Sequence, residues 1–262
     1  MMRALNTAST GMVSQQMNLD IIANNLANVN TTAFKMQRAE FQDLMYQTLR
    51  ASGATTGGET TLPQSAQIGL GSRFANSSTS FAAGSLQPAN DPHYMAIQGD
   101  GFFQVRLPDG SLGFTRDGSF KADANGLIVT SDGYPLEPEI TVPPGTNGLT
   151  IAPAGAVTGV LPGSNEASDL GSIQVVMFSN PAGLTRMGQN LYVSGGASGE
   201  PQVVEPGQEG SGLIQQGFIE GSNVQVVDEM VKMIVAQRAY EINSKAIQTS
   251  DDMLSILNGL KR

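Results

Sequence analysis

Few residues of this 262-residue chain have the types and spacing needed for acid–base, nucleophilic or metal chemistry. The only histidine is His93, and there is no cysteine. A metal site or a Ser-His-Asp system would therefore have to be built around a single imidazole. We interpret His93 as a loop histidine and expect neither a catalytic residue nor a metal site.

Two short segments resemble ligand-binding loops only in part. Asp123, Asn125 and Gly126 match part of a calcium loop, but the other ligand positions and the closing glutamate are missing. Gly99-Asp100-Gly101 begins like a phosphate-binding loop, but the third glycine and the following helix are absent. We interpret the first as a turn and the second as the entry to a strand, and we expect no cofactor.

Composition limits the partners. The formal net charge is -9, with 14 lysines and arginines, which argues against nucleic acid because phosphates require clustered cations. Charged residues make up 14% of the chain, so copies can pack side by side with little repulsion. The acidic pairs Asp228-Glu229 and Asp251-Asp252 are interpreted as solvated faces or salt-bridge partners between subunits. We expect no cleaved signal peptide and no membrane-spanning helix.

The two chain ends are predicted to be helices, because the prolines all lie between Pro63 and Pro206. An apolar stripe with steps of three and four residues runs along each end. Asn28 and Asn30 are plausible stops for the first helix, and Ser222 with Gln225 fits a capping box for the second. We predict that the two stripes pair within one chain through Leu5, Met12, Leu19, Ile22, Leu26, Val235, Ile242, Ala246, Met253 and Ile256.

Each helix also carries a second apolar stripe. On the C-terminal helix these residues recur every seven positions, at roughly 100–160° from the first stripe. We predict that they pack between neighbouring subunits; the residues are Val13, Met17, Ile21, Met233, Tyr240, Ile247 and Leu254. The alternative is that this second face packs on the chain's own middle part.

The middle of the chain is predicted to be β structure, because short apolar runs alternate with Asp-Gly and Asn-Gly turns at 109–110, 117–118, 125–126 and 132–133. A short helix is predicted around Phe34, Phe41, Leu44, Met45 and Leu49. The fold class is therefore α+β, with long terminal helices paired as a coiled-coil-like hairpin, an inserted antiparallel β domain and extended connectors. The predicted boundaries are 1–45 (N-terminal helical part), 46–94 (connector), 95–194 (β domain), 195–221 (returning connector) and 222–262 (C-terminal helix).

Four motifs carry a family resemblance that covers nearly the whole chain. The run from Ile22 to Lys35 resembles the N-terminal signature of bacterial flagellar rod and hook proteins. The run from Ser222 to Glu241 is similar to the matching C-terminal signature. Gly99 to Phe103 and Thr115 to Phe120 are similar to the family's middle region. Ala33 stands where the family usually has glycine, and Asn6 where an aromatic residue is common.

The resemblance implies an axial, helical homopolymer with the terminal helices inside and the β domain outside. Met2 to Leu5, the run from Arg38 to Leu44 and the length are most like subunits of the distal rod, and the segment from about Tyr46 to Gln67 is linked there to a straight, stiff shaft. The implied partners are proximal rod proteins, the hook protein, the surrounding L and P ring proteins and the flagellar type III export apparatus. The implied place is the basal body, from periplasm to outer membrane.

Three alternatives remain open. The chain could be a hook or proximal rod subunit of the same family. It could be an enzyme, such as a wall-cutting hydrolase on a coiled-coil stalk, which requires a cluster of titratable groups in one cleft. It could also be a monomeric β adhesin, which predicts a stable monomer with ordered ends.

Overall fold

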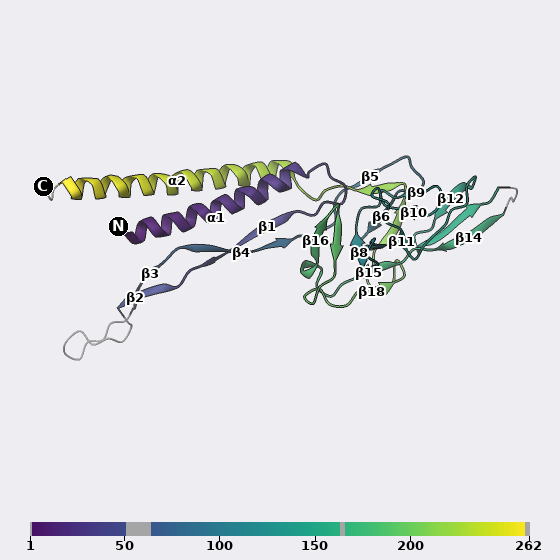
Figure 1. Cartoon of the computed structure of the whole chain (residues 1–262), viewed down its shortest axis with the longest axis horizontal. Helices are drawn as coiled ribbons and strands as arrows, with labels where there is room; N and C mark the ends of the chain where they lie inside the picture. Colours follow the sequence, from purple (N-terminus) through teal and green to yellow (C-terminus); the bar gives the residue numbers. More distant parts are fainter. Residues whose placement is uncertain (1, 51–63, 163–165, 260–262) are drawn as a thin grey trace. The chain divides into compact units, whose positions relative to one another are not determined.

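The computed structural model describes residues 2–50, 64–162 and 166–259. The chain divides into two compact units, and each is described by itself. We call Met1–Ala27, Gln37–Ser78 and Gln225–Arg262 the helical unit, and Asn28–Met36 and Thr79–Val224 the β unit. The order of the elements (Figure 1) confirms the α+β class, with a helix at each end and antiparallel sheets between them.

The two terminal helices belong to the helical unit. Helix α1 spans Met2–Ala27 and stops just before Asn28, as predicted, and α2 spans Val226–Gly259. They run antiparallel side by side in Figure 1. A Cβ atom on Gly11 would lie 2.9 Å from the Asn243 side-chain nitrogen. The side-chain nitrogen of Asn25 donates a hydrogen bond to the Glu229 carboxylate at 3.1 Å.

The predicted capping box of α2 is wrong. The Ser222 hydroxyl accepts a hydrogen bond from the Val224 N–H at 3.3 Å, and the first helical hydrogen bond runs from the Glu229 N–H to the Gln225 carbonyl. The Ser222 to Val224 segment lies in the β unit instead, where Asn223 donates to the Ser80 and Ala82 carbonyls. The sequence pattern was right about a helix start but placed it four residues early.

A β-hairpin follows α1 where a short helix was predicted. Its arms are β1 (Gln37–Asp43) with β4 (Ser72–Thr79), and β2 (Tyr46–Arg50) with β3 (Ala66–Gly69). The helical spacing of Phe41, Leu44 and Leu49 misled the prediction, because their strand partners lie about 20 to 30 residues further on. Phe41, for example, packs edge-on against Phe74, with ring centroids 6.2 Å apart. Residues 51–63, within the predicted connector, lie outside the described residues.

The β unit is built from short antiparallel strands. Its five-stranded sheet has the order β11-β7-β8-β17-β16, and a three-stranded sheet has the order β12-β13-β14. The strands are β5 (Leu86–Pro88), β6 (Met95–Gln98), β7 (Phe103–Arg106), β8 (Leu112–Thr115), β9 (Lys121–Ala122), β10 (Ile128–Val129), β11 (Leu136–Glu137), β12 (Asn147–Ile151), β13 (Ala156–Val160), β14 (Ala167–Ser172), β15 (Val175–Met177), β16 (Thr185–Gly188), β17 (Leu191–Val193), β18 (Gln202–Val204), β19 (Leu213–Gln216) and β20 (Phe218–Glu220). A single 3-10 turn, Pro181–Gly183, precedes β16.

Two clusters of apolar side chains form the core of the β unit. The larger includes Met95, Phe103 and Phe120, all fully buried, and the two rings lie 5.2 Å apart in an edge-to-face arrangement. The smaller is mostly aromatic and includes Phe102, Phe114 and Phe178. Edge-to-face rings add about 0.5–1.5 kcal/mol per pair to the burial of their area.

Three of the four predicted turns join consecutive strands. The Gly110, Gly126 and Gly133 N–H groups each donate to the carbonyl three residues earlier, as a tight turn requires. The Asp117-Gly118 dipeptide is different, because it forms no such turn. A Cβ on Gly118 would lie 1.5 Å from the Met95 carbonyl oxygen, so this glycine is needed for a close backbone approach.

The predicted returning connector, 195–221, is largely part of the β unit. Within it, β18 pairs with β15, β19 with β6 and β20 with β5. The polar, glycine-rich composition of residues 195–212 hid β18, since its partner β15 lies far away in the sequence. The predicted connector over 46–94 likewise contains strands β2 to β5.

A buried ion cluster ties three distant segments of the β unit together. Lys35, Arg116 and Glu220 expose 0%, 2% and 1% of their side chains. Glu220 accepts from the Lys35 ammonium at 2.7 Å and from the Arg116 guanidinium at 2.8 Å. The Gly84 N–H donates to the same carboxylate at 2.8 Å. The Arg116 guanidinium also donates to the Gly99 and Gly101 carbonyls.

The cluster holds two cations and one anion, and its pKa values follow from that. Burial alone would raise the pKa of Glu220, but the two cations and the Gly84 N–H outweigh it, so the pKa is lowered. Burial and the nearby Arg116 lower the pKa of Lys35, because together they outweigh the attraction of the single carboxylate.

The β unit is therefore expected to lose stability in acid partly through Glu220. Because the folded pKa lies below the unfolded one, this contribution is present above the unfolded value near 4.5 and disappears as the pH falls through the folded value. Urea unfolding between pH 7 and pH 3 should show a steeper loss of stability in the native chain than in Glu220→Gln. Equal slopes for the two proteins would contradict the assignment.

Candidate assembly surface

The residues considered for chemistry do not converge on a reactive site. The His93 ring nitrogen contacts the Asp91 carboxylate at 2.9 Å in a loop. The Gly99-Asp100-Gly101 segment presents its carbonyls to Arg116 rather than its N–H groups to a phosphate. In the part of the chain that the structure describes, no group of three or more His, Cys, Asp or Glu side chains could hold a metal ion.

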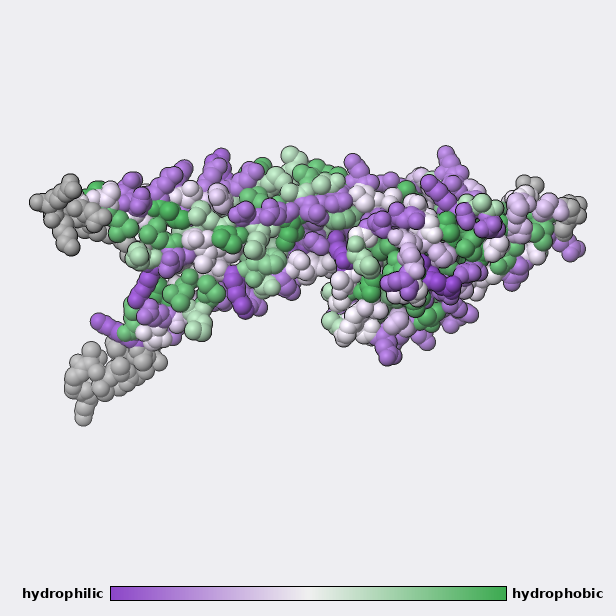
Figure 2. All heavy atoms as spheres, viewed as in Figure 1, coloured by the Kyte–Doolittle hydropathy of each residue, from purple (hydrophilic) through white to green (hydrophobic). Residues whose placement is uncertain are grey.

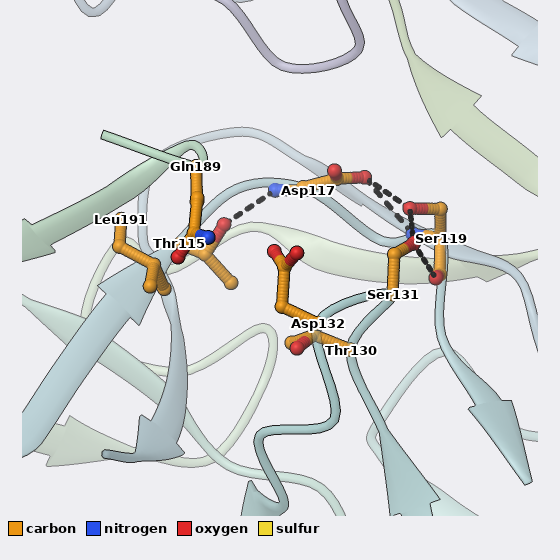
Figure 3. A pocket seen from close by; sticks show the side chains of 8 residues that line it. All are labelled: Thr115, Asp117, Ser119, Thr130, Ser131, Asp132, Gln189 and Leu191. Atoms are coloured by element: carbon orange, nitrogen blue, oxygen red, sulfur yellow. Dashed lines mark hydrogen bonds between the residues drawn. The ribbon is translucent and has the colours of Figure 1, made fainter. Parts of the chain in front are cut away.

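One small polar pocket lies in the β unit (Figure 3). Its volume is about 20 Å³, which is room for roughly one water molecule. The carboxylate of Asp117 is already occupied, since it accepts from the Ser119 N–H at 3.0 Å and the Ser119 hydroxyl at 2.8 Å. This pocket is therefore too small to hold a sugar ring, and one of its two acids, Asp117, is already hydrogen-bonded.

The exposed apolar surface of the helical unit is its most unusual feature. On α1, Val13 is 51% exposed and Met17 is 40% exposed. On α2, six of the exposed apolar residues fall within one sector of about 80° around the helix and expose between 46% and 74% of their surface. We call these six residues the α2 outer strip: Val227, Val231, Val235, Ile242, Met253 and Ile256. Figure 2 shows hydrophobic residues along the visible face of both helices.

The α1 residues named for the two predicted faces differ in burial. Ile22 is buried, and Leu5, Met12, Leu19 and Leu26 are half-buried. The residues assigned to contacts between subunits are the exposed Val13 and Met17 and the half-buried Ile21.

On α2 the observed burial is the opposite of the predicted one. Residues predicted to pair with α1 are exposed, and most of those predicted to contact neighbouring subunits are half-buried. Four of the residues expected to pair with α1 are exposed, at 62% (Val235), 66% (Ile242), 46% (Met253) and 62% (Ile256), and Ala246 is exposed as well. Met233, Ile247 and Leu254, which were assigned to neighbouring subunits, are half-buried, and Tyr240 is 41% exposed. The reason is that Glu229, Ala236 and Ser250, on the same side as these residues, are the buried positions of α2.

The hairpin carries further exposed apolar side chains. Met45, Tyr46 and Leu49 on one arm are 82%, 56% and 53% exposed, and Ile68 on the other is 42% exposed. Sequence reasoning did not assign these to a surface, because it placed part of the segment in a helix. Among the described residues, no helix has the length and apolarity needed to span a membrane.

Comparisons with known proteins match this chain along most of its length. The family model "Flagella basal body rod protein" matches residues 5–35, "Flagellar hook protein FlgE/F/G D1 domain" matches 96–159, and "Flagellar basal body rod FlgEFG protein C-terminal" matches 215–260. The flagellar basal-body rod protein FlgG of Borreliella burgdorferi is 51% identical over 264 residues, covering 100% of both chains. That of Buchnera aphidicola subsp. Schizaphis graminum is 46% identical over 260 residues, covering 99% of this chain and 100% of the relative.

These relatives, together with the exposed helix faces, define the class: this is a structural protein rather than an enzyme. The chain belongs to the flagellar basal-body rod protein family. The family resemblance read from its motifs is thereby confirmed. As a member, it is a structural subunit of the flagellar basal-body rod, which assembles with other flagellar components.

Proposed function

We propose that this chain is a distal rod subunit that polymerises with copies of itself into a rigid, hollow, helical drive shaft. The observation that carries the proposal is identity of 46–51% to rod proteins over the full length of both chains. A shaft that transmits torque to the hook needs extensive lateral contacts, and the exposed helix faces supply apolar surface for them. Each buried aliphatic side chain contributes about 1.5–3 kcal/mol when fully covered.

We propose that α1 and α2 pair as a coiled-coil-like antiparallel hairpin and that neighbours pack on its outside. The Gly11–Asn243 approach and the Asn25–Glu229 hydrogen bond support the pairing. The proposed contacts with neighbours are Val13, Met17 and Ile21 on α1 and the α2 outer strip, with Tyr240 at their margin. Contacts of this head-to-tail kind propagate as an open helix rather than closing into a dimer.

The remaining partners follow from the family. We propose contacts with proximal rod proteins at one end and the hook protein at the other, and with the L and P ring proteins around the shaft. The proposed location runs from the periplasm to the outer membrane. Export through the flagellar type III apparatus without a cleaved signal is proposed from the family to which the chain belongs.

Excision of residues 46–67 tests the distal rod assignment against the alternative of a hook or proximal rod subunit. The cut removes β2 and half of β3 but leaves the β1–β4 pair, so the helical unit should still fold. We expect the native chain to assemble into straight rods and the excised chain into curved ones, measured by electron microscopy. Straight filaments from both chains would favour another axial subunit. A native chain that stays monomeric at any concentration would contradict the proposal that the protein polymerises.

A further inference from the structure

The contact between α1 and α2 contains a buried polar pair whose geometry is more specific than the apolar contacts around it. Asn25 is 1% exposed and Glu229 is 2% exposed. The Asn25 amide nitrogen donates to the Glu229 carboxylate at 3.1 Å and to the Gln37 carbonyl at 2.8 Å. Its oxygen accepts from the Gln37 N–H at 2.9 Å. The amide thus connects the end of α1, the start of α2 and the start of β1.

The Glu229 carboxylate also has a partner on its own helix. Its second oxygen accepts from Lys232 at 2.6 Å, and the Lys232 side chain is 52% exposed. The Asn25 amide therefore supplies a buried donor to the carboxylate from the opposite helix. If α2 moved by one turn along α1, the amide and the carboxylate would separate, and both would stay buried without this partner. Buried polar groups that lose a partner are penalised strongly, whereas small apolar contacts tolerate a shift.

Apart from Glu229, the fully buried side chains of α2 are small, and the half-buried Met233, Ile247 and Leu254 lie on the same side of the helix. Gly11 faces Asn243, and the other buried positions of α2 are Ala236 and Ser250. The larger apolar side chains of the α2 outer strip point away from this contact. In paired helices, one buried asparagine is enough to specify register.

We propose that Asn25, through Glu229, sets the register in which the two terminal helices pair. It therefore determines the axial offset between the exposed apolar residues of α1 and the α2 outer strip. Asn25 is a positioning residue, since it acts through Glu229 and Gln37 rather than on a partner molecule. The inference rests on the proposed pairing of the helices and adds the residue that fixes it.

Cysteine reporters test the register, because the chain has no cysteine of its own. The in-register reporter carries Gly11→Cys and Asn243→Cys. The shifted reporter carries Gly11→Cys, Asn243→Ala and Ile247→Cys, so both lack the Asn243 side chain, and position 247 lies one turn, about 6 Å, further along α2. Disulfide formation in the full-length monomer is followed under a glutathione buffer, because a disulfide requires Cβ atoms about 4 Å apart.

With Asn25 present, the equilibrium constant for disulfide formation should be at least about tenfold larger in the in-register reporter than in the shifted one. This is the size of effect that one lost buried hydrogen bond produces. The double variant Asn25→Leu/Glu229→Leu replaces both partners with apolar groups and should keep the helices paired while bringing the ratio close to one. Asn6→Leu, at an exposed position on the same helix, should leave the ratio unchanged.

Two outcomes overturn the inference in different ways. If the double variant keeps the native ratio, the helices are paired but Asn25 does not set their register. If the in-register reporter fails to close in the otherwise native chain, the helices do not pair as proposed, and the register inference fails with the pairing.

Discussion

Replacing Ile242 with aspartate should abolish rod assembly at concentrations where the native chain polymerises, while the monomer stays folded. Ile242 lies in the α2 outer strip and is 66% exposed in the single chain. In an assembled rod, the new carboxylate would lose water without gaining a partner, and burying an unpaired charge costs several kcal/mol. We therefore expect the critical concentration for assembly to rise by at least a factor on the order of one hundred.

The matched control is Gln237→Asp, which adds a carboxylate to the same helix. Position 237 is exposed and lies about 140° around the helix from position 242. Light scattering gives the critical concentration and circular dichroism gives the thermal stability of each monomer. Both variants should unfold within about 0.5 kcal/mol of the native chain, because each alters an exposed position. Normal assembly of Ile242→Asp, or equal loss in both variants, would remove the α2 outer strip from the assembly surface.

Replacing Glu220 with alanine should be the most destabilising single change in the β unit. It would leave the Lys35 ammonium and the Arg116 guanidinium buried beside each other, with no carboxylate between them. Removing one member of a buried ion pair typically costs about 3–5 kcal/mol, because a charge stays buried without compensation. Urea unfolding, followed by circular dichroism at wavelengths that report strands and helices separately, measures the loss.

Two further substitutions make this prediction specific. Lys35→Met removes one cation but leaves the Arg116–Glu220 pair intact, so its cost should be smaller, about 1–3 kcal/mol. Glu200→Ala removes an exposed glutamate of the same unit and should cost less than about 0.5 kcal/mol. A Lys35→Met variant as unstable as Glu220→Ala would show that the cluster acts through packing rather than charge compensation.

Two of the four motifs that suggested the family supply a side chain to this cluster, which the motifs alone did not indicate. Lys35 ends the N-terminal signature, Arg116 lies in the middle motif, and Glu220 precedes the C-terminal signature. Ala33, two residues before Lys35, has a positive φ of 54° and donates its N–H to the Glu220 carbonyl at 2.8 Å. The backbone at Ala33 is thus left-handed, and this is where the chain leaving α1 contacts the segment leading to α2.

Much of the local structure was predictable from local signals. The exclusion of proline from the ends gave both helices, and the Asp-Gly and Asn-Gly dipeptides gave most turns of the β unit. The hairpin of β1 to β4 was missed because Phe41, Leu44 and Leu49 have helical spacing, and strand pairing with distant residues leaves no mark on a single segment. Strand β18, within residues 195–212, was missed for the same reason.

The sequence by itself determined that two terminal helices carry more apolar surface than one partner can cover, and its motifs determined the family. Only the tertiary structure decided which face of α2 is turned inward. Hydrophobic burial has no direction, so two apolar stripes on one helix are equivalent until polar residues distinguish them. Asn25 and Glu229 do so, because their hydrogen bond forms only across the two helices, and it leaves Val235 and Ile242 on the outside.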